Sequence, residues 1–172
     1  ARNWRGNLLS FGGCFKANDD SRWLNDCWVY SPARNEWTEI ETSKTPGAVR
    51  PPPRSACVLA VTGDTLVVWG GYSEVKCDNA VKAAGKEHVD AWTLALDTGI
   101  WERLSLKGRP PSQRAGANAV GKGDLCYVFG GVHDQDGEGL SPASEFYDDV
   151  GILDLAARRW HQAISGGGPA PR

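Results

Sequence analysis

The side chains with the most potential for chemistry lie in an acidic segment that spans residues 133–148. Its histidine and carboxylates are His133, Asp134, Asp136, Glu138, Glu145 and Asp148. Such a cluster binds calcium, recognises a basic protein surface or remains solvated. An EF-hand loop places ligands at its first, third and fifth positions before a glycine, and Gly137 follows Asp134 too early for that. A surface for a basic partner and a solvated loop therefore stay open as interpretations.

The other histidines and the cysteines lack the spacing of a metal or catalytic site. His88, His133 and His161 are far apart, and none has a second histidine at ligand spacing. The five cysteines form no CxxC pattern: Cys14, Cys27, Cys57, Cys77 and Cys126. An odd number of thiols, three of them inside expected strands, favours a reducing compartment. We therefore expect a cytoplasmic protein, with the nucleus as the alternative, and predict no metal ion and no cofactor.

Composition excludes several functional classes. The net charge of the 172 residues is −2 with both signs interspersed, which predicts no binding to nucleic acid or to an anionic membrane. No apolar run approaches the twenty residues of a membrane-spanning helix. The sequence contains no nucleophile elbow, P-loop or dinucleotide fingerprint. It also has no methionine, so we expect a fragment or a processed product.

A repeat of about sixty residues reveals the elements that must position these side chains. Residues 54–71, RSACVLAVTGDTLVVWGG, return at residues 114–131 as RAGANAVGKGDLCYVFGG. Both copies read as a strand of small residues (strand a), a tight turn, an apolar run (strand b) and a glycine pair. In both, an arginine lies sixteen positions before the first glycine. A third glycine pair, at residues 12–13, follows the apolar run LLSF.

Each glycine pair precedes a polar segment and then an aspartate that opens another strand (strand c). A tryptophan in strand d follows each aspartate eleven positions later; the pairs are Asp26 and Trp37, Asp90 and Trp101, and Asp149 and Trp160. The constant offset predicts a hairpin with turns at residues 32–35, 97–99 and 156–158. The sequence therefore predicts an all-β fold of four-stranded antiparallel units, with a short helix as an option only within residues 76–88.

These features resemble the kelch repeat, and the resemblance covers essentially the whole chain. It implies that each unit is one blade of a β-propeller. Residues 54–104 and 114–164 would be complete blades, and residues 165–172 would begin a further one. Residues 1–40 would form an incomplete blade that has lost its arginine and strand a. The segments after the glycine pairs are similar to those of the kelch domain-containing protein four subfamily and its fungal relatives.

The resemblance and the residue types assign packing roles to the repeated positions. A glycine pair removes two Cβ atoms where backbone or a ring comes close, and the strand-d tryptophan covers a face between adjacent blades. About two and three-quarter blades leave apolar faces open, so further blades of the same chain or a self-associated copy are expected partners. The structural positions are Gly12, Gly13, Gly70, Gly71, Gly130, Gly131, Trp37, Trp101, Trp160, Arg54, Arg114, Asp26, Asp90 and Asp149.

Function is expected on one face, because alternating strands bring the b–c loops and the d–a connections to the same end. The long irregular segments expected there span residues 14–22, 41–53, 72–88, 105–112 and 132–147. Loops on a rigid scaffold often bind partners, so we predict a non-enzymatic protein-protein interaction scaffold; solvated insertions are the plain alternative. The candidate contact residues are Trp23, Tyr72, His133, Asp134, Asp136, Glu138 and Phe146.

Two other functions remain open. A substrate-receptor subunit of a ubiquitin ligase would need an adaptor-binding domain outside these residues. A metal-dependent enzyme is the second, because the resemblance extends to kelch-like propellers that are copper radical oxidases or sialic-acid mutarotases. Such enzymes need paired tyrosine, histidine and cysteine ligands or a set of acidic residues with histidine, and no such set is assembled from this sequence.

Overall fold

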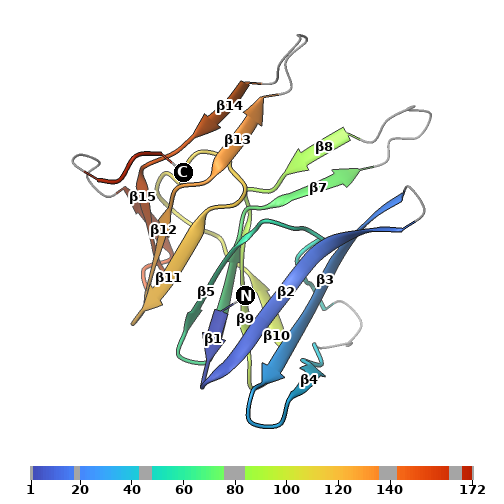
Figure 1. Ribbon diagram of the computed structural model, residues 1–172. Helices are drawn as coiled ribbons and strands as arrows, with labels where there is room; N and C mark the ends of the chain where they lie inside the picture. Colours follow the sequence, from blue (N-terminus) through green and yellow to red (C-terminus); the bar gives the residue numbers. More distant parts are fainter. Residues whose placement is uncertain are drawn as a thin grey trace.

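The computed structural model describes residues 2–17, 20–42, 48–75, 84–135, 143–162 and 168–171, and every regular element within them is a β-strand (Figure 1). Three four-stranded antiparallel sheets and two two-stranded hairpins make up the described structure. The predicted all-β fold of four-stranded antiparallel units is therefore confirmed.

The three sheets repeat one plan, in which strands a, b, c and d pair in that order. The first contains β1 (Arg2–Trp4), β2 (Asn7–Ala17), β3 (Asp20–Ser31) and β4 (Glu36–Glu39). The second contains β5 (Val58–Thr62), β6 (Thr65–Trp69), β9 (Ala91–Ala95) and β10 (Ile100–Arg103). The third contains β11 (Asn118–Lys122), β12 (Leu125–Phe129), β15 (Val150–Asp154) and β16 (Arg159–Gln162). We call them blades 1, 2 and 3.

The prediction that blade 1 has lost its strand a is wrong. The three residues of β1 occupy that position and pair with β2, Arg2 opposite Leu9. Hydrogen bonds to blade 2 hold this short strand, because Arg2 Nε donates to the Leu59 carbonyl at 2.5 Å and Trp4 Nε1 to the Asp64 carboxylate at 2.9 Å. A partial strand a is therefore present.

The segments between strands b and c also differ from the prediction, because much of what was expected to be irregular is paired. In blade 1, β2 and β3 continue past the glycine pair, after a register shift between Phe11 and Gly13. In blade 2, β7 (Tyr72–Val75) pairs with β8 (Ala84–Glu87), and in blade 3, β13 (Val132–Gln135) pairs with β14 (Ala143–Phe146). The optional helix is wrong for residues 84–87, which are β8; residues 76–83 lie outside the described part.

The glycine pairs let strand b leave the sheet and let neighbouring backbone come close. Gly12 has a φ of 59°, and a Cβ there would stand 2.6 Å from the carbonyl oxygen of Arg54 in blade 2. Gly71 has a φ of 94°, and its Cβ would stand 2.6 Å from the Ser55 carbonyl oxygen of its own blade. Both positions therefore require glycine, the first for blade-to-blade contact and the second for contact within the blade.

The hydrophobic core lies between the blades. On β6, Leu66 and Val68 join a cluster shared with blade 1, whereas Val67 and Trp69 join a cluster shared with blade 3. A strand covered on both faces needs a continuous apolar run. The inner strand β5 lies beside both β1 and β11, so the blades converge at their strand-a edges, as in a propeller.

Candidate interaction surface

The three b–c hairpins project from the same end of the blades (Figure 1). We call this surface the hairpin face; it consists of residues 13–17 and 20–24 of β2 and β3, of β7–β8, and of β13–β14. The short a–b and c–d turns lie at the opposite end, which we call the turn face. The tips of the β7–β8 and β13–β14 hairpins, residues 76–83 and 136–142, lie outside the described residues.

A buried arginine-aspartate pair anchors the base of the hairpin face in blade 2. The Arg54 side chain is fully buried, and its guanidinium donates to both carboxylate oxygens of Asp90, at 2.8 and 3.2 Å. It also donates to the carbonyls of Gly70 at 3.0 Å and Pro52 at 3.1 Å. One side chain therefore ties the start of the blade to the ends of strand b and the beginning of strand c.

Blade 3 repeats this anchor. Arg114 binds both carboxylate oxygens of Asp149 and donates to the Gly130 carbonyl at 3.1 Å. Its guanidinium also lies over the Tyr147 ring, 3.8 Å from the centroid. Asp26, the matching residue of blade 1, accepts from Trp28 Nε1 at 2.7 Å, and within the described residues no arginine pairs with it.

The anchor perturbs the titration of its neighbours. Burial by itself raises the pKa of the Asp90 carboxyl, but the hydrogen bonds from Arg54 and Trp92 and the Arg54 charge outweigh it, so the pKa is lowered. His88 is buried, with its Nε2 2.9 Å from the Ser73 hydroxyl. Burial, with the Arg54 charge, lowers the pKa of His88 to about 4. His88 is therefore neutral at physiological pH.

Side-chain contacts join the three hairpins into one row. Trp23 of blade 1 packs edge to face against Tyr72 of blade 2, with ring centroids 5.4 Å apart. Tyr72 lies opposite Glu87 in the β7–β8 pairing, and a carboxylate oxygen of Glu87 lies 2.7 Å from His133 Nδ1 of blade 3. The structure thus brings together Trp23, Tyr72 and His133, three of the predicted contact residues.

Sequence reasoning missed Glu87, which completes the row. It belongs to a segment of mixed charge whose lysines and carboxylates nearly cancel, and no repeat position marks it. Only the distance to a histidine in the next repeat identifies it, so the signal is tertiary.

The remaining predicted contact residues lie apart from the row or outside the described structure. Phe146 is 55% exposed and lies opposite Val132 in the β13–β14 pairing. Asp134 lies on β13 opposite Ser144, and its side chain lies outside the described structure. Asp136 and Glu138 lie outside the described residues altogether. The predicted acidic surface for a basic partner therefore stays a prediction.

The strand-d tryptophans occupy different environments. Trp101 is 6% exposed and packs on Phe11 of blade 1, with ring centroids 5.3 Å apart. Trp160 is 4% exposed and packs on Trp69 of blade 2 at 5.2 Å. Trp37 is 52% exposed and contacts Tyr30 of its own blade.

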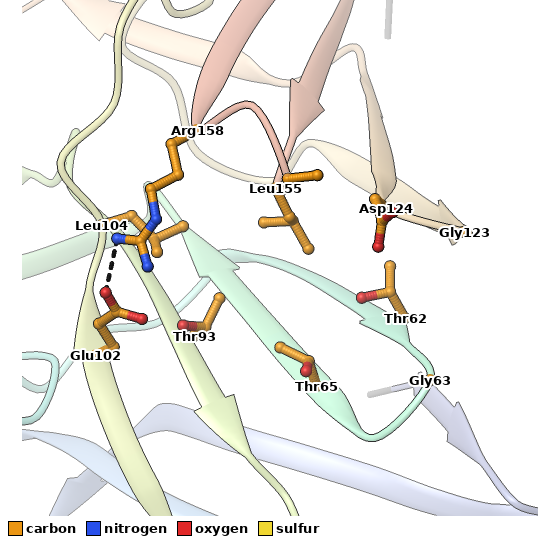
Figure 2. Close-up of a pocket in the computed structure, with 11 residues that line it drawn as sticks. Thr62, Gly63, Thr65, Thr93, Glu102, Leu104, Gly123, Asp124, Leu155 and Arg158 are labelled. Carbon is orange, nitrogen blue, oxygen red and sulfur yellow. Dashed lines mark ion pairs between the residues drawn. The ribbon is translucent and has the colours of Figure 1, made fainter.

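Hollows occur on both faces. At the base of the hairpin face, a groove of about 610 Å³ and a smaller one of about 370 Å³ adjoin β8. On the turn face, a hollow of about 490 Å³ between blades 2 and 3 is lined by threonine side chains and by an ion pair between Glu102 and Arg158 at 2.6 Å (Figure 2). Because that ion pair is half exposed at both ends, it contributes little to stability.

Within the described residues, no three or more histidine, cysteine, aspartate or glutamate side chains gather closely enough to hold a metal ion. None of the described elements is a helix of the length and hydrophobicity needed to cross a membrane.

Comparison with known proteins identifies a family model and relatives to which this chain is similar. The sequence profile described as the KLHDC2/KLHL20/DRC7 Kelch-repeats domain matches residues 1–172. Human Kelch domain-containing protein 1 is 33% identical over 82 residues, which cover 48% of this chain and 19% of that protein. Acyl-CoA-binding domain-containing protein 5 of Arabidopsis thaliana is 28% identical over 171 residues, which cover 98% of this chain and 22% of that protein.

The chain thus spans about a fifth of the length of these curated relatives. The narrower resemblance to the kelch domain-containing protein four subfamily stays a prediction. The match over the full length, together with three sheets that repeat the glycine pair, the strand-c aspartate and the strand-d tryptophan, shows that the chain belongs to the kelch-repeat family.

Proposed function

We propose that this protein is a non-enzymatic scaffold that binds another protein on its hairpin face. Kelch-repeat domains generally mediate protein-protein interaction and are generally non-catalytic, and the family assignment covers the whole chain. The choice of face rests on the geometry of this chain.

The observation that carries the proposal is the row from Trp23 through Tyr72 and Glu87 to His133. These contacts connect hairpins from three different blades side to side. A surface whose side chains are already held in place loses less conformational entropy when a partner binds. The turn face, with its short turns, offers no comparable projecting elements among the described residues.

The exposed side chains of this surface suit a protein partner. Aromatic residues are enriched at protein interfaces, and Phe146 exposes more than half of its surface on β14. Glu145, its neighbour, is also exposed and accepts a hydrogen bond from the Tyr147 hydroxyl at 3.0 Å. The predicted contacts Asp134, Asp136 and Glu138 extend the same hairpin toward its tip.

The experiment compares two matched variants of the full-length protein in affinity purification with quantitative mass spectrometry. The hairpin-face variant carries Glu145→Ala and Phe146→Ser. The control carries Asp124→Ala and Ile100→Ser on the turn face, and so also removes one exposed carboxylate and one exposed apolar side chain. We expect specific partners to be lost from the first and retained by the second.

Equal recovery of the same partners by both variants would count against the hairpin face. A third variant, with alanine at Asp134, Asp136 and Glu138, tests the prediction of a basic partner: a selective loss of basic proteins supports it, and undiminished recovery removes it.

The proposal includes the compartment and the neighbours of the chain. A cytoplasmic location, or a nuclear one, is supported by free thiols in the core: burial raises the pKa of Cys27 and of Cys126 to about 12 each. The exposed apolar side chains of blades 1 and 3, among them Leu8, Trp37 and Val120, suit coverage by further blades of the same protein or by a second copy.

A further inference from the structure

The larger groove lies beside β8, at the base of the hairpin face. Its lining comes from the connection that follows blade 1, at Ala48, Val49, Arg50 and Pro52, and from residues 86–90. Trp92 and Arg103 belong to strands c and d and also line the groove. With a volume of about 610 Å³, it is large enough for several side chains of an extended peptide.

Three cations lie along this groove without a counter-charge. Arg50, Lys86 and Arg103 are all exposed, and in the described part of the chain none of them makes an ion pair. Arg103 lies over the Trp92 ring, 6.0 Å from its centroid, which orients its guanidinium.

Two carboxylates also line the groove. Asp90 is paired with the buried Arg54, whereas Glu87 lies 2.7 Å from His133 Nδ1 and keeps its negative charge. The three cations outnumber Glu87, so the net charge of the groove is positive, although the chain as a whole carries −2. A local field of this kind attracts a carboxylate-bearing group to one place on the surface.

Apolar side chains are exposed between these cations. Val49 is 55% exposed and Val89 is 57% exposed, and both line the groove. Exposed apolar surface surrounded by charged groups is typical of interaction sites. The groove thus offers an apolar surface for an apolar side chain of a ligand and hydrogen-bond donors for its carboxylates.

We propose that this groove binds an extended acidic segment of a partner protein, with its apolar side chains against Val49 and Val89 and its carboxylates on Arg50, Lys86 and Arg103. Guanidinium groups bind carboxylates with two parallel hydrogen bonds. A single-stranded nucleic acid would need open aromatic faces for its bases to stack on, and the Trp92 side chain is buried. The inference rests on the proposed scaffold function and adds the chemistry of the partner.

The test measures fluorescence anisotropy with the full-length protein and a fluorescein-labelled decapeptide that alternates glutamate with leucine. We expect binding that weakens as salt is raised, because exposed charges are screened. The variant R50E/K86E/R103E should bind at least about tenfold more weakly. The control K107E/R109E/K122E makes the same change of charge at exposed positions outside this groove and should stay within about twofold of the unmodified protein.

A second variant separates the apolar contribution, and melting curves establish that each variant is folded. Val89→Ser should weaken binding about threefold to tenfold, because it removes apolar contact without changing charge. A peptide with serine in place of leucine should lose affinity in the same way. The single change Lys86→Gln keeps the test of the charges valid if the triple variant does not fold.

Several results would overturn the inference: no binding of the acidic peptide, equal weakening in the groove and control variants, or equal binding of a peptide with lysine in place of glutamate. Preferential binding of a twelve-nucleotide single-stranded RNA, or binding only to a second copy of this chain, would assign the groove to another occupant. If the peptide fails while the hairpin-face variant still loses its partners, the scaffold function stands and only the acidic ligand is wrong.

Discussion

Trp37 and Trp101 occupy the same position in consecutive blades, yet one is 52% exposed and the other 6%. The difference lies in the neighbours. Trp101 packs on Phe11, which projects from strand b of blade 1, and Trp160 packs on Trp69 of blade 2 in the same way. A strand-d tryptophan therefore stabilises the interface with the preceding blade rather than its own sheet.

The strands of the middle and last blades support the same conclusion. Along β6 the four residues from Leu66 to Trp69 are all buried, whereas along β12 buried and partly exposed residues alternate. Both strands have apolar sequences, but only β6 contributes to two hydrophobic clusters, one shared with blade 1 and one with blade 3. The number of adjacent blades therefore explains the difference in burial.

The largest expected effect comes from removing the buried tryptophan. In the 172-residue chain, Trp101→Ala should lower the free energy of unfolding by about 3–5 kcal/mol, because it leaves a large cavity between blades 1 and 2. Trp37→Ala should cost less than about 1 kcal/mol, since this ring loses little buried area. Urea denaturation followed by circular dichroism measures both. Equal losses would show that the tryptophan stabilises its own sheet instead.

The sequence predicted the parts of the fold that repeat. The arginine precedes the first glycine by sixteen positions in two blades, and the aspartate precedes the tryptophan by eleven in all three. The second offset is set within one blade by hairpin geometry. The sequence did not predict β7, β8, β13 and β14, because their residues are mostly polar and show no apolar alternation. They pair with each other as separate two-stranded sheets directly after the glycine pair of each blade.

The candidate site was predictable only residue by residue. Trp23 and Tyr72 were predicted as contact residues of the loop face, but their contact with each other depends on how blade 1 packs against blade 2. The bond between Glu87 and His133 depends in the same way on blades 2 and 3. Contacts between blades join residues that are far apart in the sequence and that no short-range pattern relates. They therefore could not be predicted from the sequence alone.

Blades 1 and 2 also differ in the arginine-aspartate anchor, which blade 2 has and the described part of blade 1 lacks. Asp90→Ala should cost about 2–4 kcal/mol, because it leaves the fully buried Arg54 without its counter-charge. Asp26→Ala removes only the hydrogen bond from Trp28 among the described contacts and should cost about 1 kcal/mol. Thermal melting of the two variants beside the unmodified chain measures the difference. A larger loss for Asp26→Ala would mean that the anchor does not depend on its arginine.

The smallest expected effect concerns pH and is confined to blade 2. The residue two positions before the strand-c aspartate is Leu24 in blade 1, His88 in blade 2 and Tyr147 in blade 3. Since the pKa of His88 is lowered from 6.5 to about 4 in the folded chain, the unfolded chain binds the proton more readily between these values. Stability should therefore fall by roughly 2–3 kcal/mol as the pH decreases from about 6.5 to about 4.

His88→Gln is the matched control for this acid sensitivity, because glutamine keeps a polar side chain near Ser73 without a titrating ring. Its stability should be nearly constant over the same pH range, as determined from urea midpoints at each pH. Asp90 does not cause a decrease in stability over this pH range. Because its pKa is lowered in the folded chain, the stabilisation from its carboxylate is lost only below the ordinary pKa of aspartate. If the stability of the glutamine variant decreased between pH 6.5 and pH 4 as much as that of the unmodified chain, His88 would be excluded as the cause. The decrease would then come from titrating groups elsewhere in the chain.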